Sequence, residues 1–221
     1  MKSLIVVDVG STLGRFVGEG RSTATVLAGL AAPTFPRDLI ARTVCRVLHR
    51  APALTEDVIR EVCDELHIER DAWPEPWPDS SFEPYDDTLD CLARLSAVGP
   101  VVALSNLSVT GRPRMEALAH MCGKYLTDIY PSYQLGACKP ARWLWRYVAD
   151  LHGMRPHQVI HVGDRWAEDV LGPLSVGGRA VWTKRRDVPV PEGTAVLPGE
   201  RWTAVEGLAA AVAVVEQWAE A

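Results

Sequence analysis

Residues 4–13 read LIVVDVGSTL, an apolar run that leads into a single aspartate and a turn of small residues. Four aliphatic side chains in a row, at 4–7, are typical of a strand that is buried on both faces of a parallel sheet. Asp8 follows this run directly, and glycine, serine and threonine come soon after it. A carboxylate and a small-residue turn at the end of a buried strand indicate a site for a phosphate group.

The same kind of apolar run recurs along the chain, at 101–104, 159–162 and 179–182. Helix-like segments lie between or after these runs, at 85–98, 115–125, 140–152 and 168–174. Strands that alternate with helices predict an α/β fold with a Rossmann-like, doubly wound parallel sheet. We expect the last strand near 194–197 and the last helix at 204–219.

Residues 15–82 interrupt this alternation, because they show helical patterns only, for example at 36–49 and 55–66. The segment ends in the proline-rich stretch WPEPWPDSSFEP, residues 73–84. Proline fixes φ and interrupts helix and sheet alike, so this stretch is expected to connect two parts of the molecule. The sequence thus predicts a core domain at 1–14 and 83–221, with a helical domain at 15–82 inserted after the first strand.

The chain has 221 residues and a net charge of -5, which leaves no basic surface for nucleic acid or an anionic membrane. A small molecule is the better expected partner, whereas protein partners stay open. The four apolar residues before Asp8 are too few for a signal peptide or a membrane span. We therefore expect a cytoplasmic protein.

Several reactive residue types have ordinary structural interpretations. The five cysteines form no CxxC pair and none has a histidine at metal-ligand spacing, so packed, reduced thiols are expected. His161 lies inside a predicted strand and is assigned to the core. Arg42 and His49 of the insert could reach a substrate, although packing or solvation is the simpler role for both.

Polar residues gather where the predicted strands end, which is where open α/β sheets bind ligands. Asp8 ends the first strand, Ser105 and Asn106 end the second in VVALSNLS, and Asp164 ends a later one in VIHVGDRWAEDV. Lys139 follows in YQLGACKP, just before a helix. Each residue alone has a plainer interpretation as a helix or turn cap. Their joint occurrence at one end of one sheet favours a catalytic site.

The chemistry of this set is phosphoryl transfer. Asp8 is the candidate nucleophile, and it would share a Mg²⁺ ion with Asp164, since this ion prefers a few carboxylates plus substrate oxygens. Thr12, Ser105 and Asn106 are candidates for binding the phosphate group, while Lys139 neutralises its charge. Asp169, five residues after Asp164, is the candidate for ordering a metal-bound water or the lysine behind these groups.

The four segments VVDVGSTL, ALSN, GACKP and GDRWAED, in this order, resemble the four motifs of the haloacid dehalogenase superfamily. The resemblance covers the whole core, about 150 residues, and the helical segment at 15–82 resembles the C1 cap of that family. It implies a Mg²⁺-dependent hydrolase, most often a phosphatase of a small phosphorylated metabolite, that acts through an aspartyl phosphate. It also implies that the backbone carbonyl of Gly10 binds the cation.

Position 10 departs from the family pattern. Phosphatases of the superfamily usually carry DxDxT, and the second aspartate protonates the leaving oxygen and then activates water. Glycine removes this proton transfer, which is worth roughly 10²- to 10⁴-fold in rate.

Three explanations of Gly10 remain open. The enzyme could be a phosphatase whose substrate has a good leaving group or whose proton comes from the cap or the substrate. It could catalyse another reaction of the superfamily, although dehalogenases do not use Mg²⁺ and phosphonate hydrolases need a cap lysine, which residues 15–82 lack. It could also be a catalytically impaired protein that binds a phosphorylated ligand or a protein partner.

Overall fold

The computed structural model describes residues 3–183 and 201–220. Within these residues the main sheet has six strands in the order β5-β4-β1-β6-β7-β8, and each pairing in it is parallel. The strands are β1 (Leu4–Val7), β4 (Val101–Ser105), β5 (Asp128–Pro131), β6 (Val159–Gly163), β7 (Arg179–Thr183) and β8 (Trp202–Val205). The predicted α/β class is confirmed.

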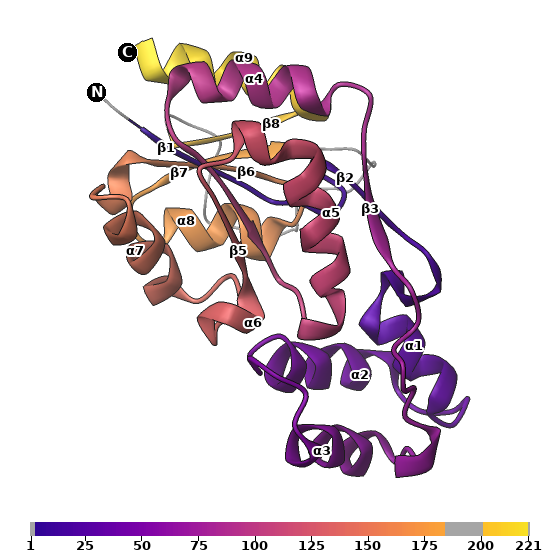
Figure 1. The fold of residues 1–221 in the computed structure, drawn as a ribbon. Helices are drawn as coiled ribbons and strands as arrows, with labels where there is room; N and C mark the ends of the chain where they lie inside the picture. The colour runs from indigo at the N-terminus through magenta and orange to yellow at the C-terminus, as the bar shows by residue number, and fades with distance from the viewer. Residues whose placement is uncertain (1–2, 184–200, 221) are drawn as a thin grey trace.

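Helices cover both faces of this sheet (Figure 1). One face carries α4 (Thr88–Val98), α5 (Arg112–Cys122) and α9 (Gly207–Glu220), and the other carries α7 (Arg142–Leu151). The short helices α6 (Ser132–Leu135) and α8 (Gly172–Leu174) flank α7 in Figure 1. Ile5 and Val7 of β1 pack against the first layer, whereas Leu4 and Val6 pack against α7. This alternation, with every one of these side chains buried, explains the continuous apolar run.

The inserted segment forms a helical body of its own at one end of the molecule (Figure 1). It contains α1 (Thr23–Leu30), α2 (Arg37–Thr43), a π-helical segment (Val44–Leu48) that continues α2, and α3 (Glu56–Leu66). Leucine, isoleucine and valine side chains from these helices share a separate apolar cluster that Trp73 completes. The helical insertion is confirmed, and α1 is an additional helix that the sequence pattern did not predict.

The expectation that residues 15–82 hold helices only is wrong. β2 (Gly14–Val17) pairs with β3 (Ser81–Pro84) in a two-stranded antiparallel sheet that joins the insert to the core. Both strands have only four residues, and β3 contains proline, so neither shows a recognisable strand pattern by itself. Their pairing depends on the two ends of the insert meeting in space.

The C-terminal prediction needs a second correction. The strand expected at 194–197 falls outside the described residues, whereas WTAV at 202–205 forms β8 and the last helix begins at Gly207 rather than 204. β5 also escaped prediction, because Asp128–Pro131 is short, only partly buried and closed by proline. Among the described residues, no helix is long and apolar enough to span a bilayer.

Candidate active site

The centre of the site is Asp8, immediately after β1. β1 lies between β4 and β6, so the strand order reverses around it. The Asp8 backbone N–H donates a hydrogen bond of 2.9 Å to the carbonyl of Val162 on β6, which holds the turn against the neighbouring strand. Ser105 ends β4 and Asp164 follows β6. The topology therefore brings these three predicted residues to the carboxyl edge of the sheet, at its switch point.

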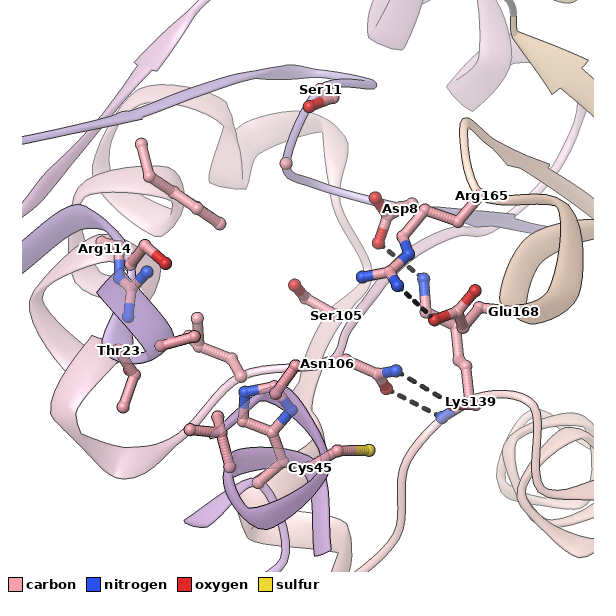
Figure 2. A pocket seen from close by; sticks show the side chains of 18 of the residues that line it. Asp8, Ser11, Thr23, Cys45, Ser105, Asn106, Arg114, Lys139, Arg165 and Glu168 are labelled. Carbon is pink, nitrogen blue, oxygen red and sulfur yellow. Dashed lines mark hydrogen bonds and ion pairs between the residues drawn. The ribbon is translucent and has the colours of Figure 1, made fainter. Parts of the chain in front are cut away.

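Lys139 joins two carboxylates beneath this edge. Its Nζ lies 2.5 Å from Asp8 Oδ1 and 2.7 Å from Asp169 Oδ1, and its side chain is 2% exposed. The charge of both aspartates raises the pKa of Lys139 although burial alone would lower it. The lysine is therefore positively charged next to the candidate nucleophile (Figure 2).

Asn106 fixes the backbone of Lys139 from the opposite side. Its Oδ1 accepts a 2.7 Å hydrogen bond from the lysine N–H, and its Nδ2 donates one of 2.9 Å to the lysine carbonyl (Figure 2). This bidentate pair aligns two loops that are distant in sequence. Asn106 also lines the cavity described below, but these amide contacts give it a positioning role.

Asp169 lies behind Lys139, with no exposed surface. Its Oδ1 accepts from Lys139 and contacts His161 Nε2 at 2.9 Å, while its Oδ2 accepts from the backbone N–H of Arg165 at 2.9 Å. Burial alone would raise the pKa of Asp169, but the charge of Lys139 and the contacts with Lys139 and His161 lower it by more, so the net shift of the pKa is downward. A Cβ at Gly163 would lie 2.5 Å from this carboxylate, which explains the glycine of the GD pair.

His161 is buried as predicted, yet its contact with Asp169 adds a role that the sequence did not suggest. The residue occupies an ordinary interior position of β6, so the strand pattern alone predicts only a core side chain. Burial lowers the pKa of His161, which favours the neutral imidazole.

The carboxylates fit a hard divalent cation. Oxygen atoms of Asp8, Asp164 and Asp169 lie within 4.8 Å of one another, and Asp164 Oδ1 is buried with no hydrogen-bond partner among the described residues. Burial raises the pKa of Asp8 to about 7 and that of Asp164 to about 6, so a bound cation would compensate an otherwise unfavourable charge. Asp169 is occupied by Lys139 and His161, which leaves Asp8 and Asp164 as the available donors.

A cavity of about 490 Å³ opens above these groups, between the core and the insert. Core residues at its wall include Asp8, Gly10, Ser11, Ser105 and Lys139 (Figure 2). The insert closes the cavity from the other side with residues of α1, α2 and the π-helical segment, including Thr23, Ala41, Cys45 and His49. Such a volume accommodates a small metabolite.

Thr12 is fully buried and is not among the residues that line the cavity. Its contact with a phosphate group stays a prediction. Ser11, which was not a candidate, lines the cavity instead and adopts a left-handed backbone with φ of 64°. Figure 2 shows Ser11 on the turn that follows Asp8. Nothing in a single sequence distinguishes the two hydroxyl residues, since the choice depends on this turn.

Arg114 is a further cavity residue that the sequence analysis missed. It lies in the first turn of α5, is 3% exposed, and stacks on Phe16 with its guanidinium carbon 4.8 Å from the ring centre. Its Nη1 donates to the carbonyl of Arg21 at 2.7 Å. Burial lowers the pKa of Arg114 to about 10, and none of the carboxylates in the described residues forms an ion pair with it.

Comparison with known proteins extends these observations. A model of the haloacid dehalogenase-like hydrolases matches residues 21–177. No curated protein matches the sequence.

Solved structures of this superfamily have the same fold at low sequence identity. A haloacid dehalogenase-type phosphatase from Thermococcus onnurineus is 18% identical, with 97% of this chain and 98% of that chain aligned and a TM-score of 0.59. A 2-haloacid dehalogenase from Pseudomonas syringae pv. Tomato DC3000 is 16% identical, with 99% of this chain and 100% of that chain aligned and a TM-score of 0.60. A family enzyme from Bacteroides thetaiotaomicron, solved with magnesium and inorganic phosphate, is 14% identical. The alignment covers 83% of this chain and 95% of that chain, and the TM-score is 0.54. The family match spans more than half of the sequence, and the protein therefore belongs to the haloacid dehalogenase-like hydrolases.

Proposed function

We propose that this hydrolase is a Mg²⁺-dependent phosphatase of a small phosphorylated metabolite, with residues 15–82 as its C1 cap. The observation that carries this proposal is the pairing of Asp8 with Lys139 next to the unpartnered oxygen of Asp164, all at the wall of one cavity. A nucleophile, a fixed positive charge and an available carboxylate are the parts that phosphoryl transfer requires.

In the first step, a carboxylate oxygen of Asp8 forms a bond to phosphorus while the bond to the leaving oxygen breaks. Lys139, held by Asn106, neutralises negative charge at the phosphoryl group, and the hydroxyls of Ser105 and Ser11 are placed to donate hydrogen bonds to its oxygens. The leaving oxygen departs as an anion and takes its proton from solvent. This step favours substrates that make good leaving groups, such as anomeric, acyl or aryl phosphates.

Asp8 and Asp164, together with the Gly10 carbonyl, would hold the magnesium ion, while Asp169 fixes Lys139. Bound there, the ion would offset charge on the phosphoryl oxygens. The Bacteroides thetaiotaomicron family enzyme was solved with magnesium and inorganic phosphate, which supports the choice of ion and ligand.

Gly10 limits the second step most strongly. Water must attack phosphorus, lose a proton and release Asp8, but position 10 has no side chain to accept that proton. Substrates with good leaving groups avoid the need for an acid in the first step and gain nothing in the second. We therefore expect hydrolysis of the aspartyl phosphate to be slow, and the phosphorylated enzyme to accumulate.

The test is a rapid-mixing assay with an aryl phosphate and Mg²⁺. A burst of aryl alcohol close to one equivalent, followed by slower turnover, supports the proposal, together with a hydroxylamine-sensitive phosphoprotein. EDTA and Asp8→Asn should each abolish both signals. The asparagine variant keeps the shape of the side chain, which makes it the matched control.

One alternative function is binding of a phosphorylated ligand without catalysis. The absence of an acid at position 10 and the cavity between the core and the insert also suit a protein that binds a phosphorylated ligand without turnover. Failure to release phosphate or aryl alcohol from a broad panel, combined with measurable binding of inorganic phosphate, would favour this alternative. Metal-independent release of chloride from haloacids would instead refute the phosphatase proposal.

A further inference from the structure

Three sulfur and nitrogen donors meet where the insert touches the core. Cys45 lies in the π-helical segment and His49 follows that segment, so the two face the same side of the helix. Cys138 precedes Lys139 in the core loop, and its thiol donates a 3.4 Å hydrogen bond to the carbonyl of Cys45. The donor atoms of all three residues lie within 4.8 Å of one another. The expectation that no cysteine has a histidine at metal-ligand spacing is wrong, because the helical segment brings His49 beside Cys45, four residues before it.

The surroundings of the three residues leave donors available. Within residues 3–183 and 201–220, His49 Nδ1 is buried without a hydrogen-bond partner, and such an atom costs free energy unless something binds it. All five cysteines of the chain are free, so neither thiol is used in a disulfide. Hydrogen bonds from Cys138 and His49 lower the pKa of Cys45, whereas the hydrogen bond with Cys45 raises that of Cys138, so a metal ion that binds both must displace the proton of Cys138. A thiolate is the form of cysteine that binds metals.

The donor types select a particular class of ion. Thiolate and imidazole ligands suit soft or borderline ions such as Zn²⁺, whereas Mg²⁺ prefers oxygen. Two thiolates would also balance the charge of a divalent ion. The positive charge of Arg50 lies close to Cys45 and favours the thiolate form of that residue. The carboxylates around Asp8 belong to a separate group with different chemistry.

The location permits access and leaves room for a fourth ligand. Cys45 and His49 both line the 490 Å³ cavity, and Cys45 also borders a second cavity of about 560 Å³ that residues of the insert line. Figure 2 shows Cys45 across the cavity from Asp8. Three protein ligands beside an open space are the arrangement of zinc sites that retain an exchangeable position.

We propose that Cys45, His49 and Cys138 bind one soft or borderline transition-metal ion, with Zn²⁺ as the representative ion. Two ligands come from the insert and one from the core, so the bound ion ties these two parts together beside the cavity. Movement of a cap away from its core admits substrate and releases product in enzymes with lids. Occupancy of this site should therefore slow exchange through the cavity without using the magnesium ligands.

The test is a titration of the reduced, metal-free protein with Co²⁺, followed by displacement with Zn²⁺. Binding of one Co²⁺ with an intense thiolate-to-metal charge-transfer band is expected, and Zn²⁺ should remove the band. Cys45→Ser and Cys138→Ser should each weaken binding by more than the roughly 10- to 100-fold that loss of a second-shell partner costs. Cys63→Ala is the matched control, since that thiol packs inside the apolar cluster of the insert and should leave the band unchanged.

Asp164→Asn separates the two candidate metal sites, because it removes a carboxylate while the thiolate band should persist. His49→Ala provides an independent ligand deletion on the insert if Cys138→Ser does not fold. A Co²⁺ spectrum without a thiolate band, or binding that Asp164→Asn abolishes, would overturn the proposal. Unchanged affinity in Cys45→Ser and His49→Ala would do the same.

Discussion

Phe16 occupies the space next to Gly10 into which a longer side chain would project. A Cβ built at Gly10 would lie 3.0 Å from Cε2 of Phe16, and no other atom would come closer. The ring is held from two further sides, by Phe82 at 6.2 Å between ring centres and by the guanidinium of Arg114. The absence of an acid at position 10 is therefore part of a packed arrangement.

The first prediction follows from this packing. Gly10→Asp alone should fail to raise turnover of alkyl phosphates, because the new side chain meets the ring of Phe16. Gly10→Asp combined with Phe16→Ala should raise that turnover by about tenfold or more, a part of the roughly 10²- to 10⁴-fold that general acid–base catalysis supplies. The measurement is kcat for alkyl and aryl phosphates in both variants.

Phe16→Ala alone serves as the control, since it opens the space without adding an acid. Thermal unfolding of each variant should accompany the assays, because the truncation also removes contacts with Phe82. If the single Gly10→Asp variant already gains activity, Phe16 does not block the position.

Arg114 provides the second prediction. Arg114 lines the cavity without an ion-pair partner among the described carboxylates, and at an effective dielectric of about 20 its charge would attract a bound phosphate by about 4 kcal/mol at about 4 Å and by less at longer distances. Arg114→Met should therefore raise KM for phosphate substrates by about tenfold with a smaller change in kcat. The control is Arg112→Met, because Arg112 is exposed and pairs with Glu116 at 3.4 Å. Equal effects of the two substitutions would contradict a specific role of Arg114.

The carboxyl edge of the sheet was predictable because it depends on strand order more than on detail. Asp8, Ser105 and Asp164 each follow an apolar run, and parallel strands bring such positions to one edge wherever the intervening helices lie. Lys139 contacts Asp8 as well, while its role in neutralising a phosphate group stays a prediction. These residues required only a coarse assignment of strands.

Other parts of the site depend on contacts that leave no periodic signal. The ring of Phe16 reaches Gly10 through the β2–β3 pairing, which forms only when both ends of the insert meet. His161 reads as a core residue because its partner, Asp169, approaches from the next helical segment. The cluster of Cys45 and Cys138 likewise requires the insert to lie against the core.

His161 leads to a prediction about pH. Burial lowers its pKa in the folded protein below the value of about 6.5 in the unfolded chain, so the unfolded state binds the proton first on acidification. Its contribution to stability is therefore complete above about pH 6.5 and is lost as the pH falls toward the folded-state pKa. His161→Gln should lose less stability than the wild type between pH 7.5 and pH 5.

Urea unfolding at a series of pH values, without metal, measures this difference. The remaining titratable groups are the same in both proteins, so the difference between the two curves of unfolding free energy against pH isolates the contribution of His161. Parallel curves would show that His161 is not buried in its neutral form.

Asp164 gives the last prediction, which concerns metal and stability together. Its Oδ1 is buried and has no partner in the part of the chain that the structure describes, and burial raises its pKa to about 6, so near neutral pH the metal-free protein carries an unfavourable charge there. Asp164→Asn should therefore leave the metal-free protein as stable as the wild type or more so. It should also remove the stabilisation by Mg²⁺, which reaches about 2.7 kcal/mol in the wild type when the ion is at 100 times its Kd. Urea unfolding with and without Mg²⁺ measures both effects, and Asp150→Asn, an exposed substitution on α7, is the control. Retention of the Mg²⁺ effect in Asp164→Asn would place the ion elsewhere.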